Sequence, residues 1–478
     1  MRAEHQHDHQ QPHAPDAPRA VLQAVVALHA ARPAGAEAAA QARRLLVDTV
    51  GCALAGRHAQ EVQRLEAALA ACEPGEFSLP AGPSMSVQSA AQVLAMAATW
   101  DEACEGHALA HGRPGVPLVA ALLPLALKRG ARLGEFVDAF VLGYEVGARC
   151  GAWLRIRPGM HVDANWPALG VAAGVARLLG LAPQGIVQAI DIAACQLATS
   201  LYLPVAQGRT ARNTYLGHSA SLGLQAAFAS AAGIDAPEGA LAHYAENHAA
   251  PHAADHVAKA VQPQPLPDAS VLLLRDAYLK PFAAVRHVHY GATAARNLRA
   301  QLAGGTQGVS RIVLDVYEEA IVYCGNRAPR TPIQAQFSLS FGVAAMLRFG
   351  DVDPSVYAAP RFDDAELRRL EALVELQTDA GLTARGQRGA TLTVTHGAGT
   401  CEDTVGTIAG DAAHPLDRAA LAAKFTHYAA HAVDGVDGVD VVVGLNGVNA
   451  INAIHFCDGV LDAPAATALG ALWQQLVA

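Results

Sequence analysis

Charged and aromatic residues are scarce in this sequence of 478 residues, where they account for 16% and 5%. The net charge is −9 and the sequence pI is near 6.1, which argues against nucleic acid as a main partner. The sequence lacks an apolar run of the roughly 18–20 residues that a membrane-spanning helix needs, and its polar first eighteen residues do not resemble a signal peptide. We therefore expect a cytoplasmic protein with no membrane partner.

Several common chemical motifs are also missing. The sequence contains no G-x-G-x-x-G, Walker loop, G-x-S-x-G or H-E-x-x-H motif. None of its eight cysteines forms a C-x-x-C pair, and most lie in apolar runs, so we interpret them as buried, reduced thiols. His107 and His111 are four residues apart and could share a helix face as zinc ligands, but no third ligand has a suitable spacing. We expect no metal and no cofactor.

Hydrophobic residues make up 52% of the chain, with many alanines and leucines, which favours helices. The chain is longer than the roughly 250–300 residues at which a single core stops growing, so two domains are expected. Between Ala20 and Leu274, apolar residues recur at three- and four-residue spacing. This pattern predicts helices at residues 40–55, 87–99, 116–128, 133–148, 167–179, 183–200 and 215–232.

The pattern changes near Leu274, where alternating β-branched segments begin. We predict strands at 311–317 and 390–396, with helices at 334–347 and 364–373 between them. A helical pattern returns near Pro415 and predicts helices at 421–430 and 464–477. The expected fold is mostly α: a helical domain of residues 19–274 and 412–478, interrupted by a smaller α+β lid domain of residues 275–411.

Residues 1–18 carry His5, His7, His9 and His13 among polar residues and prolines. They offer nothing to bury, so we expect a disordered tail. Because the tail is rich in histidine, a non-catalytic, metal-binding protein is an alternative interpretation of the whole chain.

Acids, bases and cations gather in a few short segments. Lys280, Arg286, His287 and His289 lie within ten residues beside a proline turn, which indicates a site for carboxylates or phosphates, although a solvated basic loop has the same composition. The other candidate residues also have non-catalytic interpretations. The acidic segment can be a solvated loop, and the rest can be a structural histidine, a solvated arginine at a helix end and a core tyrosine. These candidates are Asp101, Glu102, Glu105, His111 and Arg113 in one loop, and His161, Arg212 and Tyr323 elsewhere.

In order and spacing, these segments resemble those of the MmgE/PrpD family, which includes 2-methylcitrate dehydratases, cis-aconitate decarboxylases and iminodisuccinate epimerases. The resemblance covers nearly the whole chain after the tail. It is carried by Leu45–Gly56, Gly143–Val146, Met160–Trp166, Arg212–Gly217, Lys280-Pro-Phe with His287 and His289, and Pro329–Ser338.

The resemblance implies a homodimer with a metal-free site between a helical domain and a lid. The family's catalytic loop falls on residues 101–114, where Asp101 and Glu105 are the candidate carboxylates and His111 the candidate histidine. The family's second histidine falls on His161. Its cationic residue, lid lysine and lid tyrosine fall on Arg212, Lys280 and Tyr323.

This sequence departs from the family pattern at three points. The family loop ends in His-Pro, whereas Arg113 precedes the proline here, so either Arg113 or His111 takes the histidine's place. The acidic start of the loop leaves open which carboxylate has the family role. Val285 stands where the decarboxylases have a histidine, which argues against decarboxylation.

The residue types suit proton abstraction next to a carboxylate, because the negative charge that develops must be met by fixed cations. Arg113 and Arg212 are expected to bind the substrate with His287 and His289, and Lys280 to stabilise the charge. His161 or His111 would move the proton, and Tyr323 would protonate a leaving hydroxyl or the opposite face.

We predict a metal-free lyase that removes water from a small di- or tricarboxylic acid, as 2-methylcitrate dehydratases do. The alternative is an epimerase or racemase of a dicarboxylate such as iminodisuccinate. A decarboxylase is a weaker alternative.

Overall fold

The computed structural model describes residues 17–154, 156–157, 159–246, 266–302, 305–397, 399–429 and 448–477. The histidine-rich tail lies outside the described residues except for Ala17 and Pro18, which begin the first helix, α1 (Ala17–Ala30). Across these described ranges, no helix is both long enough and apolar enough to cross a membrane.

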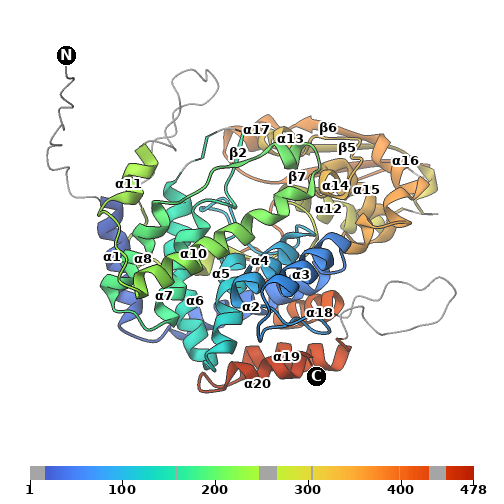
Figure 1. Ribbon diagram of the computed structural model, residues 1–478. Helices are drawn as coiled ribbons and strands as arrows, with labels where there is room; N and C mark the ends of the chain where they lie inside the picture. The colour runs from blue at the N-terminus through green and yellow to red at the C-terminus, as the bar shows by residue number, and fades with distance from the viewer. Residues whose placement is uncertain are drawn as a thin grey trace, which may run out of the picture.

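Packed helices form the larger part of the molecule (Figure 1). The centre is α7 (Pro167–Leu178), which packs against α6 (Leu133–Trp153), α10 (Tyr215–Ala231) and α5 (Gly115–Lys128). Residues 167–176 of α7 are all buried, as expected for a helix that is apolar on every side. Around this centre lie α2 (Ala36–Gly56), α3 (Gln60–Cys72), α4 (Val87–Thr99), α8 (Pro183–Ala194), α9 (Leu203–Ala206) and α11 (Ala240–Tyr244).

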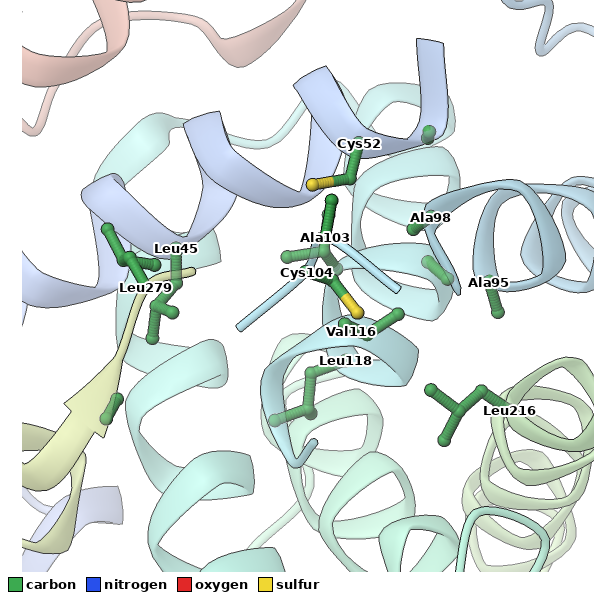
Figure 2. Close-up of a cluster of buried hydrophobic side chains, with 14 of the residues drawn as sticks. Leu45, Cys52, Ala95, Ala98, Ala103, Cys104, Val116, Leu118, Leu216 and Leu279 are labelled. Atoms are coloured by element: carbon green, nitrogen blue, oxygen red, sulfur yellow. The ribbon is translucent and has the colours of Figure 1, made fainter. Parts of the chain in front are cut away.

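Small side chains let these helices approach closely. Figure 2 shows Ala95 and Ala98 of α4 near Cys104 and Val116, with Cys52 of α2 above them. The prediction of buried thiols is confirmed for Cys52, Cys104, Cys150, Cys324 and Cys457. It is wrong for Cys72 and Cys195, which are exposed because they lie at the C-terminal ends of α3 and α8.

A four-stranded sheet lies at one end of the molecule, among the yellow and orange elements of Figure 1. Its order is β6 (Val374–Thr378), β5 (Val309–Val316), β7 (Ala390–His396), β8 (Gly399–Val405), and only the β5–β6 pair is parallel. The helix α12 (Arg286–Arg299) packs on β7 and β8, and α15 (Leu339–Phe349) packs on α12 and β6. The remaining helices here are α13 (Glu318–Cys324), α14 (Pro332–Gln336), α16 (Ala365–Leu373) and α17 (Ala380–Ala384).

The end of the chain returns to the helical part. There α18 (Arg418–Ala429) packs on α2 and α19 (Ala450–Asp462), which packs on α20 (Leu469–Val477). The Lys424 ammonium of α18 donates to Asp48 of α2 at 2.5 Å and to the carbonyl of Ala103 at 2.8 Å. The buried ion pair between Lys424 and Asp48 therefore holds α18 against α2.

The predicted fold class, mostly α with a smaller α+β part, is confirmed. Several predicted helices differ in their bounds; for example, the helix predicted at 133–148 continues to Trp153. The helix predicted at 334–347 is two helices, because Ser338 caps α15 by accepting from the Phe341 N–H. The helix predicted to reach residue 200 ends at Ala194, and the one predicted from Pro464 begins at Leu469. The division into two domains remains a prediction.

Candidate active site

A cavity of about 560 Å³ lies between the helices and the sheet-bearing part. Three stretches of chain supply most of its lining. The first is the loop after α4, with Glu102, His111 and Arg113. The second is the segment after α6, with His161 and Asp163. The third is the segment 278–287, with Tyr278, Lys280, Val285, Arg286 and His287. Tyr323 and Arg388 come from two further segments.

A short strand pair connects the first stretch to the third. Gly106–His107 (β1) pairs antiparallel with Ala277–Tyr278 (β4), which brings the loop beside Lys280. Only glycine fits at position 106, since a Cβ there would lie 2.3 Å from the Tyr278 hydroxyl. This pairing explains how residues more than 170 positions apart meet, as Lys280 Nζ and Glu102 do.

A second strand pair positions His161. Met160–His161 (β2) pairs antiparallel with Ser200–Leu201 (β3), and Tyr202 follows directly. The His161 and Tyr202 rings are stacked, with centroids 6.2 Å apart. A short 3-10 helix, η1 (Thr210–Thr214), then carries Arg212.

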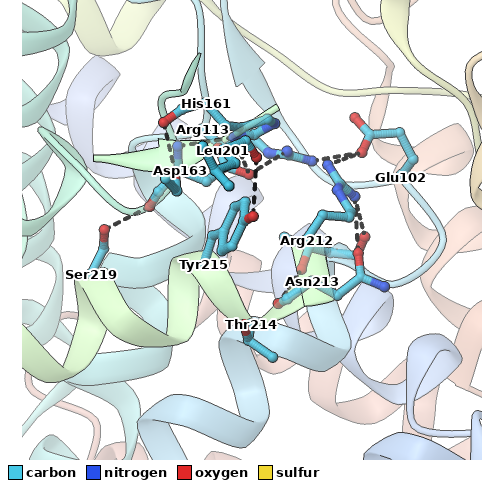
Figure 3. A network of polar contacts seen from close by, with 12 residues as sticks. Glu102, Arg113, His161, Asp163, Leu201, Arg212, Asn213, Thr214, Tyr215 and Ser219 are labelled. Carbon is cyan, nitrogen blue, oxygen red and sulfur yellow. Dashed lines mark hydrogen bonds and ion pairs between the residues drawn. The ribbon is translucent and has the colours of Figure 1, made fainter. Parts of the chain in front are cut away.

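The cations of these segments converge on Glu102 (Figure 3). Glu102 Oε2 accepts from Arg113 Nη1 at 2.9 Å and from Arg212 Nη2 at 2.8 Å. Lys280 Nζ donates to Glu102 Oε1 at 2.7 Å and to the Glu102 carbonyl at 2.9 Å. Arg113 also donates to Asp163 Oδ2 at 2.5 Å. All five side chains are at most 8% exposed.

These cations set the ionisation of both acids. Burial by itself would raise the pKa of Glu102, but the charges of Arg113, Lys280 and Arg212 hold that pKa well below its usual range. Burial likewise opposes ionisation of Asp163, yet the charges of Arg113 and Arg212 keep the pKa of Asp163 lowered at neutral pH. Both side chains are therefore anionic at neutral pH.

His161 is neutral at the same pH. Burial lowers the pKa of His161 to about 4. The nearby charges of Arg212 and Arg113 also lower this pKa, whereas Asp163 raises it. The Asp163 backbone N–H donates to His161 Nδ1 at 3.2 Å, so Nδ1 carries no proton. The neutral ring therefore carries its proton on Nε2 and is a hydrogen-bond donor there.

Aromatic rings continue along the wall from His161. Tyr202 meets Tyr323 at a centroid distance of 6.1 Å, and Tyr323 stacks on His287 at the same distance. His287 Nδ1 is 2.5 Å from the Tyr317 hydroxyl. Burial, together with Arg388 and Arg286, lowers the pKa of His287 to about 3. The ring of Tyr323 is half exposed, so this row of rings reaches from the interior to solvent.

Six of the ten predicted site residues line the cavity: His111, Arg113, His161, Lys280, His287 and Tyr323. Arg212 lies behind this wall, joined to it through Glu102, and its guanidinium is 5.5 Å from the ring centre of Phe337. His111 has a left-handed backbone, with φ 53°.

Three predicted residues lie elsewhere. Glu105 is buried at the start of α5, where its Oε1 accepts from the backbone N–H of Gly115 at 2.7 Å, so it acts as a helix cap. His289 points into the packing of α12, with Nε2 3.0 Å from the Ala284 carbonyl. Asp101 does not line the cavity; burial and the charge of Asp353 raise the pKa of Asp101 to about 7.

His107 does not have the free ring nitrogen that the zinc hypothesis requires. Its Nδ1 accepts from the Ala110 N–H at 3.2 Å, and its Nε2 is 3.0 Å from the Leu273 carbonyl. Among the described residues, no group of three or more histidines, cysteines or acids is arranged to hold a metal ion.

Several lining residues were not among the ten predicted site residues. Glu102 was named only among the three acids of its loop, and Arg286 only as part of the basic cluster. Arg286 lies with its guanidinium 4.2 Å from the ring centre of Tyr278 and pairs with Asp411, and Arg388 lies 3.5 Å from Glu319. The excess of arginine and histidine in segment 280–289 was the available signal for Arg286. No signal in the sequence pointed to Arg388.

Comparison with known families gives two matches that together span most of the chain. The sequence profile of the MmgE/PrpD N-terminal domain matches residues 21–248. The profile of the MmgE/PrpD C-terminal domain matches residues 282–438. No curated protein matches the chain.

Proposed function

The chain belongs to the MmgE/PrpD family, and from that premise we propose that it is a hydro-lyase that removes water from a small di- or tricarboxylic acid. Family membership points to an enzyme of lyase or isomerase type. The observation that carries the finer proposal is the convergence of Arg113, Arg212 and Lys280 on one buried point of a cavity that also contains a neutral histidine.

The cations suit the charge that the reaction creates. Removing a proton from the carbon next to a carboxylate gives an enediolate, with negative charge on two oxygens. Arg113 and Lys280 face the cavity and are held by buried ion pairs, so they are already oriented before the substrate arrives. Fixed charges of this kind stabilise a developing anion at little reorganisation cost.

The protonation state of His161 suits it to stabilise a developing negative charge. Since its Nε2 carries the proton and its Nδ1 accepts from the Asp163 N–H, neutral His161 is a hydrogen-bond donor at Nε2. We assign it to the enediolate or to the departing hydroxyl. His111, in the loop after α4 that lines the same cavity, is then the candidate base.

Tyr323 is the candidate acid that protonates the leaving hydroxyl. The base takes the proton from carbon, the C–O bond breaks, and the hydroxide leaves as water with a proton from Tyr323. The stack of Tyr323 on His287 holds the phenol at the cavity wall.

An epimerase is the second candidate, supported by the row of rings. Proton-transfer groups stand at both ends of that row, His161 at one and Tyr323 with His287 at the other. Reprotonation on the opposite face needs two such groups. Decarboxylation has less support, because the apolar Val285 lines the cavity where the decarboxylases have a histidine.

The test is a proton NMR screen in D₂O with EDTA present, over citrate, methylcitrate, malate, aconitate and iminodisuccinate. A hydro-lyase gives an unsaturated product from a hydroxy acid, or hydrates aconitate. An epimerase gives deuterium at an inverted carbon with no loss of water. If none of these acids changes, the proposal fails.

A further inference from the structure

The carboxylate of Glu102 is surrounded as a bound ligand would be. Three cations from separate segments donate to its two oxygens, at 2.7–2.9 Å. Glu102 itself lines the cavity, as do Arg113 and Lys280. The donor groups that an incoming carboxylate would seek are thus already engaged by a carboxylate of the chain.

The backbone at this residue is strained. Glu102 has φ 54°, in the left-handed region that non-glycine residues rarely adopt. Such conformations are unfavourable by themselves and persist where the surroundings hold them. At Glu102, the ion pairs with Arg113, Arg212 and Lys280 are the contacts that hold the side chain in place.

The cluster of ion pairs around Glu102 has a net positive charge. Arg113, Arg212 and Lys280 contribute three positive charges, and Glu102 and Asp163 contribute two negative ones, which leaves one positive charge in excess. Charges interact strongly where water is excluded. The excess positive charge therefore attracts a substrate with more than one carboxylate. The hydrogen-bond donors of the cluster, however, are already bound to Glu102 and Asp163.

We propose that the Glu102 carboxylate stands where a carboxylate of the substrate binds, and that the substrate displaces it from Arg113 and Lys280. The exchange replaces one carboxylate by another on the same donors. Lys280 stays in position during the exchange because it also donates to the Glu102 backbone carbonyl, at 2.9 Å. This inference rests on the proposed function and places one carboxylate of the substrate within the cavity.

Displacing an internal carboxylate weakens substrate binding, because only the fraction of molecules with Glu102 turned away can bind. Removing the Glu102 carboxylate therefore strengthens binding. The opposite holds if Glu102 only arranges the cations, since its loss would then disorder the site and weaken binding. The two roles predict changes of opposite sign.

The experiment is calorimetric titration with tricarballylate, a tricarboxylate with no hydroxyl to eliminate. The variants are Glu102→Gln and Glu102→Gly, the latter because glycine tolerates the positive φ. The matched control is Glu66→Gln, which breaks a buried ion pair with Arg57 outside the cavity. We expect both Glu102 variants to bind about tenfold more tightly than the wild type, and the control to bind as the wild type does.

Weaker binding by both Glu102 variants overturns the inference but leaves the proposed function standing. Absence of tricarballylate binding in the wild type and in every variant contradicts the proposed function itself. If neither variant folds, Glu102→Asp serves instead, because it keeps the charge on a side chain too short to reach all three donors. Tighter binding by Glu102→Asp supports the inference, and weaker binding overturns it.

Discussion

His161 shows how one backbone hydrogen bond fixes the role of a side chain. Because Nδ1 accepts from the Asp163 N–H and burial lowers the pKa of His161 to about 4, the ring stays a neutral donor at ordinary pH. We expect His161→Ala to lower kcat by about 10²-fold or more, the usual scale for losing an acid–base group. The check is steady-state kinetics on the substrate found by NMR; a change in KM alone would contradict the assignment.

Glu105 gives a prediction about pH and stability. Burial raises the pKa of Glu105 to about 8, although the Gly115 N–H opposes the shift. The unfolded chain loses this proton near pH 4.3. Between these values the folded state binds more protons than the unfolded state, so the contribution of Glu105 to stability falls as pH rises.

The variant Glu105→Gln removes that titration while keeping an acceptor for the Gly115 N–H. Its free energy of unfolding, relative to the wild type, should therefore increase from about pH 5 to about pH 9. Denaturant titrations of both proteins at several pH values provide the measurement. A difference that does not vary with pH would show that Glu105 is ionised in the folded protein throughout.

The sequence made the cations of the site predictable but not their partner. Arg113, Arg212 and Lys280 stood out because charge is scarce in this chain. Arg212 and Lys280 also match family positions, and Arg113 stands where the family has a histidine. The sequence did not show which of Asp101, Glu102 and Glu105 faces the cavity. In an irregular loop, a shift of one residue changes which side chain points inward. The left-handed backbone of Glu102 has no sequence signal, because glutamate rarely adopts it.

Among the elements, the two-residue pair β1–β4 matters most for the site. It aligns the loop containing Glu102 with the segment that begins at Lys280. In Gly106→Ala the new Cβ would lie 2.3 Å from the Tyr278 hydroxyl, so the Tyr278 ring and the pairing must shift. A displacement of about 1 Å in a catalytic group can cost about 10²-fold in rate, and we expect a loss of that order.

The control for this change is Gly470→Ala in α20, where a Cβ meets nothing within 4 Å. It should leave kcat/KM unchanged. The comparison is made by kinetics together with thermal unfolding, which verifies that both variants fold. Wild-type activity in Gly106→Ala would show that the β1–β4 pair does not position Lys280.

Long helices with regular apolar spacing were predictable, whereas elements fixed by tertiary contacts were not. Periodicity located α4 and α7 to within one residue. It missed α12, whose first turn holds Arg286–His289 of the cluster that was predicted to bind carboxylates or phosphates. The strand β8 was missed because its residues are polar and mostly exposed, so β7 pairing rather than burial determines it.

At the scale of the whole molecule, the end of the chain completes the helical part. Lys424 and Asp48 form a buried ion pair that joins α18 to α2. Removing one partner leaves an unpaired buried charge, which typically costs about 3–5 kcal/mol. We expect Lys424→Met to lower the free energy of unfolding by that amount in denaturant titrations; a loss below about 1 kcal/mol would place the pair in contact with solvent.

Two large-scale predictions stay predictions. The first is the homodimer that the family resemblance implies; α7 offers no apolar surface for it, because residues 167–176 are buried within one chain. The α10 helix does leave Phe228 exposed. The lid domain of residues 275–411 contains the sheet and Lys280, and we propose it as the part that closes the site.

The central claim is that the charged cavity activates a carbon–hydrogen bond next to a carboxylate. It is tested most directly by the rate of solvent deuterium exchange into the substrate, followed by NMR with EDTA, for the wild type, Lys280→Met and Lys128→Met. Lys128 lies at the end of α5, outside the cavity. The account predicts exchange in the wild type and in Lys128→Met, and a reduction of about 10²-fold or more in Lys280→Met. Exchange in Lys280→Met at the wild-type rate would contradict it.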